Sequence, residues 1–217
     1  MLGYIRTMNK IIPTILVKTK DELMERRTLL KQHFPLAQLD VGDGKFVPNR
    51  TLQLDNIKRS KLQYEVHLMV KDVLINIKKA LKLHPYSITF HYEACRSDAE
   101  ALTLINFIKK RKIRPGLAIN PQTSIKRIKD FRKHVDRILI MGVHPGFSGQ
   151  KLLSTTYAKI KGLRKGNRKL NIQVDGGVNE TNIEKLHKAG ANLFCVGHYL
   201  SGDDIAERYK LLKRMVK

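Results

Sequence analysis

Short apolar runs alternate along the chain with longer segments in which apolar residues recur every three or four positions. The short runs are rich in Ile, Leu and Val, which predicts parallel strands that are buried on both faces, and the longer segments predict amphipathic helices that cross between them. The predicted strands are residues 11–16, 37–41, 64–69, 87–90, 116–119, 137–141, 172–174 and 193–196.

Two of the predicted helices carry clear end signals. Thr19 precedes the pattern of residues 21–33 and suits an N-cap, and the pattern of residues 179–189 ends before Gly190, a residue type that commonly terminates helices. Eight strands, each followed by a helix, predict an α/β fold, a single-domain (βα)8 TIM barrel that takes in residues 1–217. A doubly wound open sheet is the alternative.

Composition supports one soluble domain. The chain has 217 residues, 42% of them hydrophobic, and no linker or low-complexity tract divides it. The apolar run 11–17 is interrupted by Pro13 and followed by Lys18, so it is too short for a membrane span and lacks a cleavage site. Cys95 and Cys195 lie far apart without metal-type spacing. These features predict a cytoplasmic protein with no membrane partner.

The charge is strongly positive: 42 basic residues minus 19 acidic residues leave +23. Basic residues recur in almost every predicted helix, and the basic run 159–169 contains no aromatic residue on which a base could stack. We therefore expect a solvated cationic surface with weak, salt-sensitive binding to polyanions, and no specific nucleic-acid site.

Polar residues stand where the predicted strands end. In a barrel these ends meet at one mouth, where chemistry takes place. Taken singly, each of these acids or histidines could have a structural role, as a paired carboxylate or as a hydrogen-bonded core histidine. Together, Asp40 and Asp175 would face each other across a substrate, and two such acids can remove a proton from one face of a carbon and return it to the other, as in an epimerase. The strand ends contribute Asp40, His67, His91, Glu93, Met141 and Asp175.

Glycine-rich segments follow the last three predicted strands, at residues 144–150, 176–177 and 197–198. Backbone amides approach a phosphate closely where no side chain intervenes, and phosphate sites in barrels are frequently built from the final loops. Each glycine pair alone is usually a turn, but three in these loops favour a sugar-phosphate ligand.

Five motifs carry a resemblance to a known family. They are Leu39-Asp40-Val41 with residues 43–49, Val66-His67-Leu68-Met69-Val70, residues 116–121, residues 145–150, and Val174-Asp175-Gly176-Gly177-Val178. In this order, from Pro13 to about Gly197, the chain resembles the ribulose-phosphate 3-epimerases.

The resemblance implies a (βα)8 barrel that interconverts D-ribulose 5-phosphate and D-xylulose 5-phosphate through a metal-stabilised enediolate. It implies Asp40 and Asp175 as the acid–base pair, and these two with His67 as ligands of one divalent ion in the barrel mouth, zinc, iron, manganese or magnesium. A homo-oligomer is expected. The substrate-binding residues implied are Thr14, His67, Met69, Met141, Gly146, Ser148, Gly149, Gly176, Gly177, Gly197 and His198.

This sequence departs from the family at several positions. Gln38 stands where the family has a histidine as fourth metal ligand, Thr14 replaces a serine, Gly42 a methionine and His198 a serine. An amide oxygen is a weaker donor than an imidazole, so a site that includes Gln38 would favour manganese or magnesium. The alternatives are that Gln38 joins a hydrogen-bond network and the ion is weakly bound or absent, that the substrate is another ketose phosphate such as a hexulose 6-phosphate, or that the barrel binds sugar phosphate with little turnover.

Overall fold

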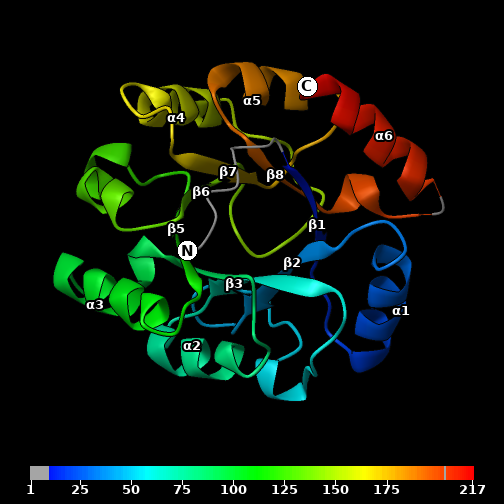
Figure 1. Cartoon of the computed structure of the whole chain (residues 1–217), viewed down its shortest axis with the longest axis horizontal. Coiled ribbons are helices and arrows are strands. Elements are labelled where there is room, and N and C mark those ends of the chain that lie inside the picture. The colour runs from blue at the N-terminus through cyan, green and yellow to red at the C-terminus, as the bar shows by residue number, and fades with distance from the viewer. Residues whose placement is uncertain (1–9, 203) are drawn as a thin grey trace.

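Eight parallel strands form a closed barrel in the computed structural model, which describes residues 10–202 and 204–217 (Figure 1). Neighbouring strands pair in chain order and β1 closes the ring by pairing with β8. The strands are β1 (Lys10–Ile15), β2 (Leu36–Gly42), β3 (Gln63–Met69), β4 (Ser87–His91), β5 (Arg114–Ile119), β6 (Arg137–Met141), β7 (Asn171–Asp175) and β8 (Leu193–Val196). The predicted barrel is confirmed, with strand ends displaced by one or two residues. That one domain takes in all 217 residues stays a prediction.

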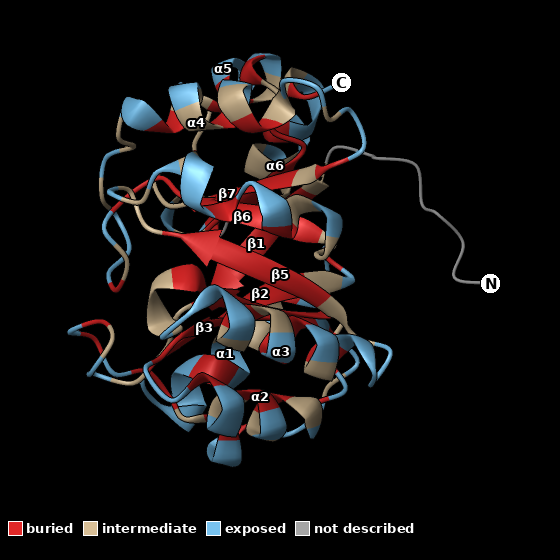
Figure 2. Cartoon of the chain, turned by 90° about the vertical axis from the view of Figure 1, so that its left-hand side faces the viewer, coloured by how far each residue is buried: buried red, intermediate tan, exposed pale blue. Residues whose placement is uncertain are grey.

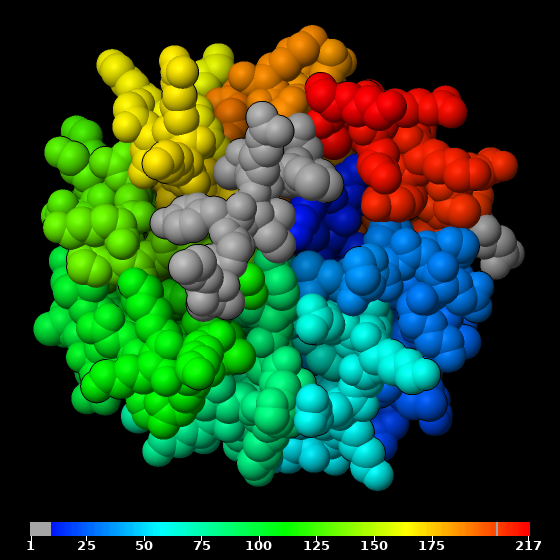
Figure 3. Space-filling view, viewed as in Figure 1, coloured from blue at the N-terminus to red at the C-terminus, as the bar shows by residue number. Residues whose placement is uncertain are grey.

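Helices surround the barrel, and the chain passes around its axis in order from the blue to the red end (Figure 3). Buried residues concentrate on the strands and on the inner sides of the helices (Figure 2). The α-helices are α1 (Lys20–Leu30), α2 (Val73–Leu81), α3 (Asp98–Lys109), α4 (Thr155–Arg164), α5 (Ile183–Ala189) and α6 (Ile205–Met215). None of the described helices is both long enough and apolar enough to cross a membrane.

The expectation that every strand is followed by an α-helix is wrong at two places in the described chain. After β2 the only helical segment is η1 (Leu54–Asn56), and after β5 there are η3 (Ile125–Ile128) and η4 (Asp130–Lys133), all 3-10 helices. Only Ile128 and Phe131 of the latter two are buried. Because this segment has so little apolar surface to pack and repeats like charges along its length, burial would contribute little free energy to stabilise a regular α-helix there.

The predicted helix ends are confirmed at Thr19 and Gly190. Thr19 forms a capping box with Glu22, and Gly190 ends α5 in the left-handed region at φ 117°. The first turn of the predicted helix 179–189 is a loop, because the side chain of Asn179 accepts from Thr181 N at 2.9 Å and that of Asn182 accepts from Asn179 N at 3.0 Å. Such side-chain bonds compete with a helical turn.

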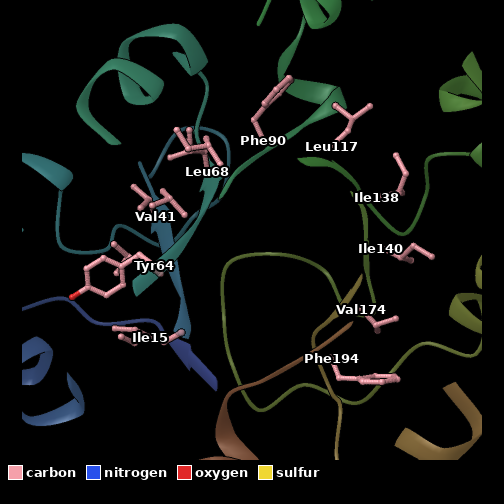
Figure 4. Packing of buried hydrophobic residues seen from close by; sticks show 14 of the residues in the cluster. Ile15, Val41, Tyr64, Leu68, Phe90, Leu117, Ile138, Ile140, Val174 and Phe194 are labelled. Atoms are coloured by element: carbon pink, nitrogen blue, oxygen red, sulfur yellow. The ribbon is translucent and has the colours of Figure 1, made fainter. Parts of the chain in front are cut away.

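Alternation along the strands separates an apolar outer layer from an interior that holds buried polar groups beside two small apolar clusters. On β2, Ala37, Leu39 and Val41 belong to the large cluster that packs under the helices, whereas Gln38 contacts Asp40 and side chains from β7 inside the barrel. Figure 4 shows members of the outer cluster from several strands. Each fully buried Leu, Ile or Phe contributes about 1.5–3 kcal/mol, so this outer layer stabilises the fold and leaves the interior free for polar groups.

The absence of a side chain at Gly116 makes room for this interior. A Cβ there would lie 2.1 Å from Thr89 Oγ1 and 3.1 Å from Arg137 Cγ. Arg137, from the next strand, can therefore lie inside the barrel, where its side chain is 3% exposed and pairs with Glu65.

Exposed cations gather in the segments that lead from each helix into the next strand. These segments contain one acidic residue in the described part of the chain, Asp136. It is partly buried, and its Oδ2 lies 3.0 Å from Arg137 Nη2. The exposed cations there are Lys31, Lys58, Arg59, Lys61, Lys82, Lys110, Arg111, Lys112, Lys165, Arg168 and Lys169.

Candidate active site

A cavity of about 290 Å³ opens at the C-terminal ends of the strands. Its walls come from the ends of β1, β2, β3 and β6 and from the loops after β6, β7 and β8. Most of the residues predicted from the sequence to bind substrate line it: Thr14, Met69, Met141, Gly146, Ser148, Gly149, Gly176, Gly177, Gly197 and His198. Asp40 and Asp175 line it as well.

Two carboxylates meet on the cavity floor, and an imidazole contacts them from below. Asp40 lies near the end of β2, Asp175 ends β7, and His67 projects from β3, which pairs with β2 so that Asp40 and His67 are register partners. His67 Nδ1 lies 2.9 Å from Asp40 Oδ1 and 3.4 Å from Asp175 Oδ2. Strands that are distant along the chain thus bring the predicted acids together, as the sequence suggested.

The electrostatic environment raises the pKa values of both Asp40 and His67. Burial, reinforced by the nearby charge of Asp175, raises the pKa of Asp40 to about 6. Burial opposes the charged form of His67, but hydrogen bonds to Asp175 and Asp40 outweigh it and raise the pKa of that imidazole to about 9. Asp40 can therefore gain or lose a proton near neutral pH, as a general acid or base must.

His67 lies below the cavity floor. It is 1% exposed and, of the residues predicted to bind substrate, it is the one that does not line the cavity. Its Nε2 lies 3.0 Å from His91 Nε2, and His91 Nδ1 lies 3.5 Å from Glu93 Oε2. His67 is thus held between the acid pair and a second histidine, which fixes its ring orientation.

Gln38 lies beneath the acid pair and turns its amide nitrogen toward it. Gln38 Nε2 donates to Asp40 Oδ1 at 2.8 Å and to Asp175 Oδ2 at 2.6 Å. The oxygen, Oε1, points the other way and accepts from Cys195 Sγ at 2.9 Å. An amide NH₂ group has no lone pair to offer a cation, so in this orientation Gln38 is a hydrogen-bond donor to the site and not a metal ligand.

The donor set fits a divalent ion with three protein ligands. Asp40, His67 and Asp175 each offer one ligand atom, and these atoms lie within 4.8 Å of one another. Two carboxylates and one imidazole are ligands that zinc, iron and manganese accept, and three protein ligands leave positions open for substrate.

The opposite wall of the cavity is made of backbone. Gly176 and Gly177 follow β7 with φ of 100° and 70°, and a Cβ on Gly177 would lie 2.6 Å from Leu152 N. In the described part of the chain, the amides of Gly176, Gly177 and Gly197 donate no hydrogen bond to the protein. Free amides without side chains suit an anion such as a phosphate.

The loop after β6 closes this wall and is tied to the loop after β2. Asn49 Nδ2 donates to Gly146 O at 2.7 Å, and Gln150 Nε2 donates to His144 O at 2.7 Å. Phe147, between them, is 54% exposed at the rim of the cavity.

Arg208 and Tyr199 also line the cavity, and sequence reasoning missed both. Arg208 lies on α6, where Nε contacts Asp204 Oδ2 at 2.6 Å and Nη1 donates to Tyr199 O at 2.9 Å. The sequence contains no signal for it, because one arginine in a helix of basic residues resembles the others until the helix is folded against β1.

Comparisons with known proteins show which sequences the chain is similar to. The family model described as "Ribulose-phosphate 3 epimerase family" matches residues 10–201. The ribulose-phosphate 3-epimerase of Bacillus subtilis is 33% identical over 205 residues, which cover 90% of this chain and 93% of that protein. The cytoplasmic isoform from Oryza sativa subsp. japonica is 33% identical over 171 residues, 76% of this chain and 74% of that one.

A solved structure shares the fold at low identity. The crystal structure of 3-hexulose-6-phosphate synthase matches with a TM-score of 0.68 and 15% identity, covering 96% of this chain and 100% of that chain. At this identity the likeness shows a common barrel architecture and nothing about chemistry.

Proposed function

Since the chain belongs to the ribulose-phosphate 3-epimerase family and is an isomerase, we propose that it inverts the configuration at C3 of a ketose phosphate, with D-ribulose 5-phosphate and D-xylulose 5-phosphate as the substrate pair. The observation that carries this proposal is the pair of carboxylates, Asp40 and Asp175, that come from β2 and β7 to one cavity floor.

Epimerisation requires a proton to leave one face of C3 and another to arrive at the opposite face. One aspartate removes the C3 proton, which leaves a negative charge delocalised onto the C2 oxygen, and the other, already protonated, donates its proton to C3 from the far side. The reverse reaction exchanges the two roles. The raised pKa of Asp40, about 6, supports this assignment because such a carboxyl can hold or release a proton at neutral pH.

The rest of the cavity would hold the substrate still during this exchange. The amides of Gly176, Gly177 and Gly197 are placed to bind the phosphate, with Ser148 and Arg208 beside them. Met69 and Met141 line the same cavity as the acids and would offer apolar surface, and the hydroxyl of Thr14, which also lines it, would contact the sugar. A phosphate anchored at one wall fixes C3 between the carboxylates, which lowers the entropic cost of proton transfer.

A divalent ion fits the floor of this cavity. Asp40, His67 and Asp175 would hold it, and when bound it supplies positive charge that offsets the negative charge developing on the substrate oxygens. The contact with His91 keeps the ring of His67 in place, because the second nitrogen of a ligating histidine usually has a hydrogen-bond partner that fixes the orientation of its ring.

The test is solvent deuterium incorporation at C3, measured by NMR on D-ribulose 5-phosphate and, in parallel, on a hexulose 6-phosphate. The assay is run on chelated protein and again after addition of zinc, manganese or magnesium, with metal content measured on the same samples. Incorporation into the pentulose at the higher kcat/KM supports the proposal. Preference for the hexulose would identify the alternative substrate, and no incorporation into either would show a barrel that binds without turnover.

Location and assembly complete the proposal. We infer a cytoplasmic protein, which the name of the Oryza sativa relative supports. A homo-oligomer remains a prediction, checked by light scattering of the purified protein. Absence of a specific nucleic-acid partner also remains a prediction, checked by binding to unrelated sequences at two salt concentrations.

A further inference from the structure

A buried polar network lies inside the barrel beneath the acid pair, and the proposed reaction does not use it directly. Its members are Arg137 on β6, Glu65 on β3, Gln173 on β7 and Cys195 on β8, together with Gln38 on β2. All five are 3% exposed or less. Charged and amide groups at this depth cost free energy unless each finds its partner, so their hydrogen-bond directions are strongly constrained.

Arg137 sets the first direction in this network. A guanidinium has donors only, and Arg137 Nη1 contacts both Glu65 Oε1 and an atom of Gln173 at 3.4 Å. The Gln173 atom facing it must therefore be the amide oxygen. The other end is then the nitrogen, Nε2, which donates to Glu65 Oε2 at 2.9 Å and to Cys195 Sγ at 2.9 Å. Two neighbours, one that only donates and one carboxylate, impose the same orientation on Gln173.

Gln173 passes this constraint to Gln38. Cys195 Sγ accepts from Gln173 Nε2, so its own proton is free to donate to one end of the Gln38 amide, 2.9 Å away, which must be the oxygen. Gln173 Nε2 itself lies 3.3 Å from the same atom. The Gln38 nitrogen is thereby directed upward, where its two protons reach Asp40 Oδ1 at 2.8 Å and Asp175 Oδ2 at 2.6 Å. Both donors of the amide are used, one for each carboxylate.

We propose that Gln38 is a positioning residue that bridges Asp40 and Asp175, and that Arg137 and Gln173 fix its amide in the donating orientation. The bridge holds two mutually repelling carboxylates at the separation that the proton exchange needs, whether or not an ion is present. It also limits a bound ion to three protein ligands, because the rotation that would turn Oε1 toward the ion would set Nε2 against the donors of Gln173 and Cys195. This inference rests on the proposed function for its kinetic readout only.

The first test observes the Gln38 side-chain amide directly by ¹⁵N–¹H NMR in chelated protein without substrate. The signal is assigned by its loss in Gln38→Leu, and the exposed Gln63 at the start of β3 provides an internal reference. We expect the Gln38 amide protons to exchange with solvent far more slowly than those of Gln63. Exchange as fast as that of Gln63 would overturn the bridge.

The second test removes the orienting group. Gln173→Met keeps the length of the side chain but has no donor, and Gln63→Met is the matched control. We expect faster exchange of the Gln38 amide protons and a fall in kcat of about 10- to 100-fold, the usual loss for a supporting residue, with KM changed less than about twofold. Unchanged exchange and unchanged kcat would overturn the role of Gln173.

A third variant covers the case in which Gln173→Met does not fold. Gln38→Asn keeps an amide but is one methylene too short to reach both the acids above and Gln173 below, and it leaves the Arg137–Glu65 pair intact. We expect the same loss of kcat at nearly constant KM, and a kcat within about twofold of wild type would overturn the proposal. If wild-type protein shows a protected Gln38 amide that Gln173→Met releases, yet no epimerisation, the proposed function fails while the bridge stands.

Discussion

The two walls of the cavity differ in whether side chains or backbone atoms form them. The wall at β2, β3 and the end of β7 is made of side chains that project from strands and are held by buried hydrogen bonds, as Asp40 is by Gln38 and His67. The wall formed by the loops after β7 and β8 is made of backbone, at positions such as Gly177 where a side chain has no room. In the proposed reaction, the side chains of the first wall would transfer the protons, and the backbone of the second wall would bind the anion.

This difference teaches where substitutions will act. Changes in the side-chain wall should lower kcat, because they alter proton transfer after the substrate is bound. Changes in the backbone wall should raise KM, because they weaken a contact that is equally strong in the ground state and the transition state. The following predictions test this division, from the largest effect to the smallest.

Removing either acid should have the largest effect. We expect Asp40→Asn and Asp175→Asn each to lower kcat by about 10³-fold or more with the fold intact, because general acid–base groups contribute about 10²–10⁴-fold each and neither face of C3 can be served by the other acid. Turnover by coupled assay and thermal unfolding by circular dichroism are the measurements. Asp72→Asn, an exposed aspartate before α2, is the control. A loss of only one or two orders of magnitude in both variants contradicts the two-base assignment.

Adding a methyl group to the backbone wall should act on binding. Gly177→Ala places a Cβ 2.6 Å from Leu152 N at φ 70°, whereas Gly166→Ala has a similar φ of 75° but meets nothing within 4 Å. Both variants carry the strain of about 1–3 kcal/mol expected for a left-handed alanine. Only Gly177→Ala should raise the KM for sugar phosphate and the Ki of inorganic phosphate. Equal effects in the two variants would mean that strain, and not the cavity wall, is responsible.

Changing the donor beneath the acids should alter metal retention. Gln38→His introduces an imidazole where the resembled family has a ligand, so we expect tighter zinc binding than in wild type, measured by titration calorimetry after chelation. Wild-type protein, with the three ligands Asp40, His67 and Asp175, should lose zinc more readily than this variant. If Gln38→His raises neither metal retention nor turnover, residue 38 does not lie at a ligand position and the ion is held by other groups.

Removing the arginine at the rim should have the smallest effect. Arg208 is about one third exposed, and exposed charge pairs contribute about 0.2–1 kcal/mol, so Arg208→Met should raise KM about two- to fivefold at unchanged kcat. Arg214→Met, exposed in the last turn of the same helix, is the matched control. A large drop in kcat for Arg208→Met would place this side chain with the chemistry and break the division between the walls.

The site residues that lie on strands could be predicted from the sequence, because polar residues stand near the ends of recognisable hydrophobic runs. Asp40, His67 and Asp175 each stand at the end of such a run, and a closed barrel brings run ends together whatever the loops do. The glycine loops were accessible for a related reason, since glycine marks positions where the backbone alone can make the contact.

The missed parts depend on contacts that no local pattern reports. Arg137, Glu65 and Gln173 could have been noticed as polar residues inside predicted strands, but their mutual hydrogen bonds depend on the stagger of three separate strands. The absence of α-helices after β2 and β5 depends on how little apolar surface those connections can bury, and Arg208 reaches the cavity only through the docking of α6.

The exposed lysines and arginines between helices and strands affect events before any contact is made. A phosphorylated sugar carries about two negative charges, and a protein with a net charge of +23 attracts it within the Debye length, which is about 8 Å at physiological ionic strength. Substrate and product are both drawn toward the molecule, so salt should slow arrival and speed departure together. The charges of the outer surface should therefore change the rate of diffusional encounter and not the rate of the catalytic step.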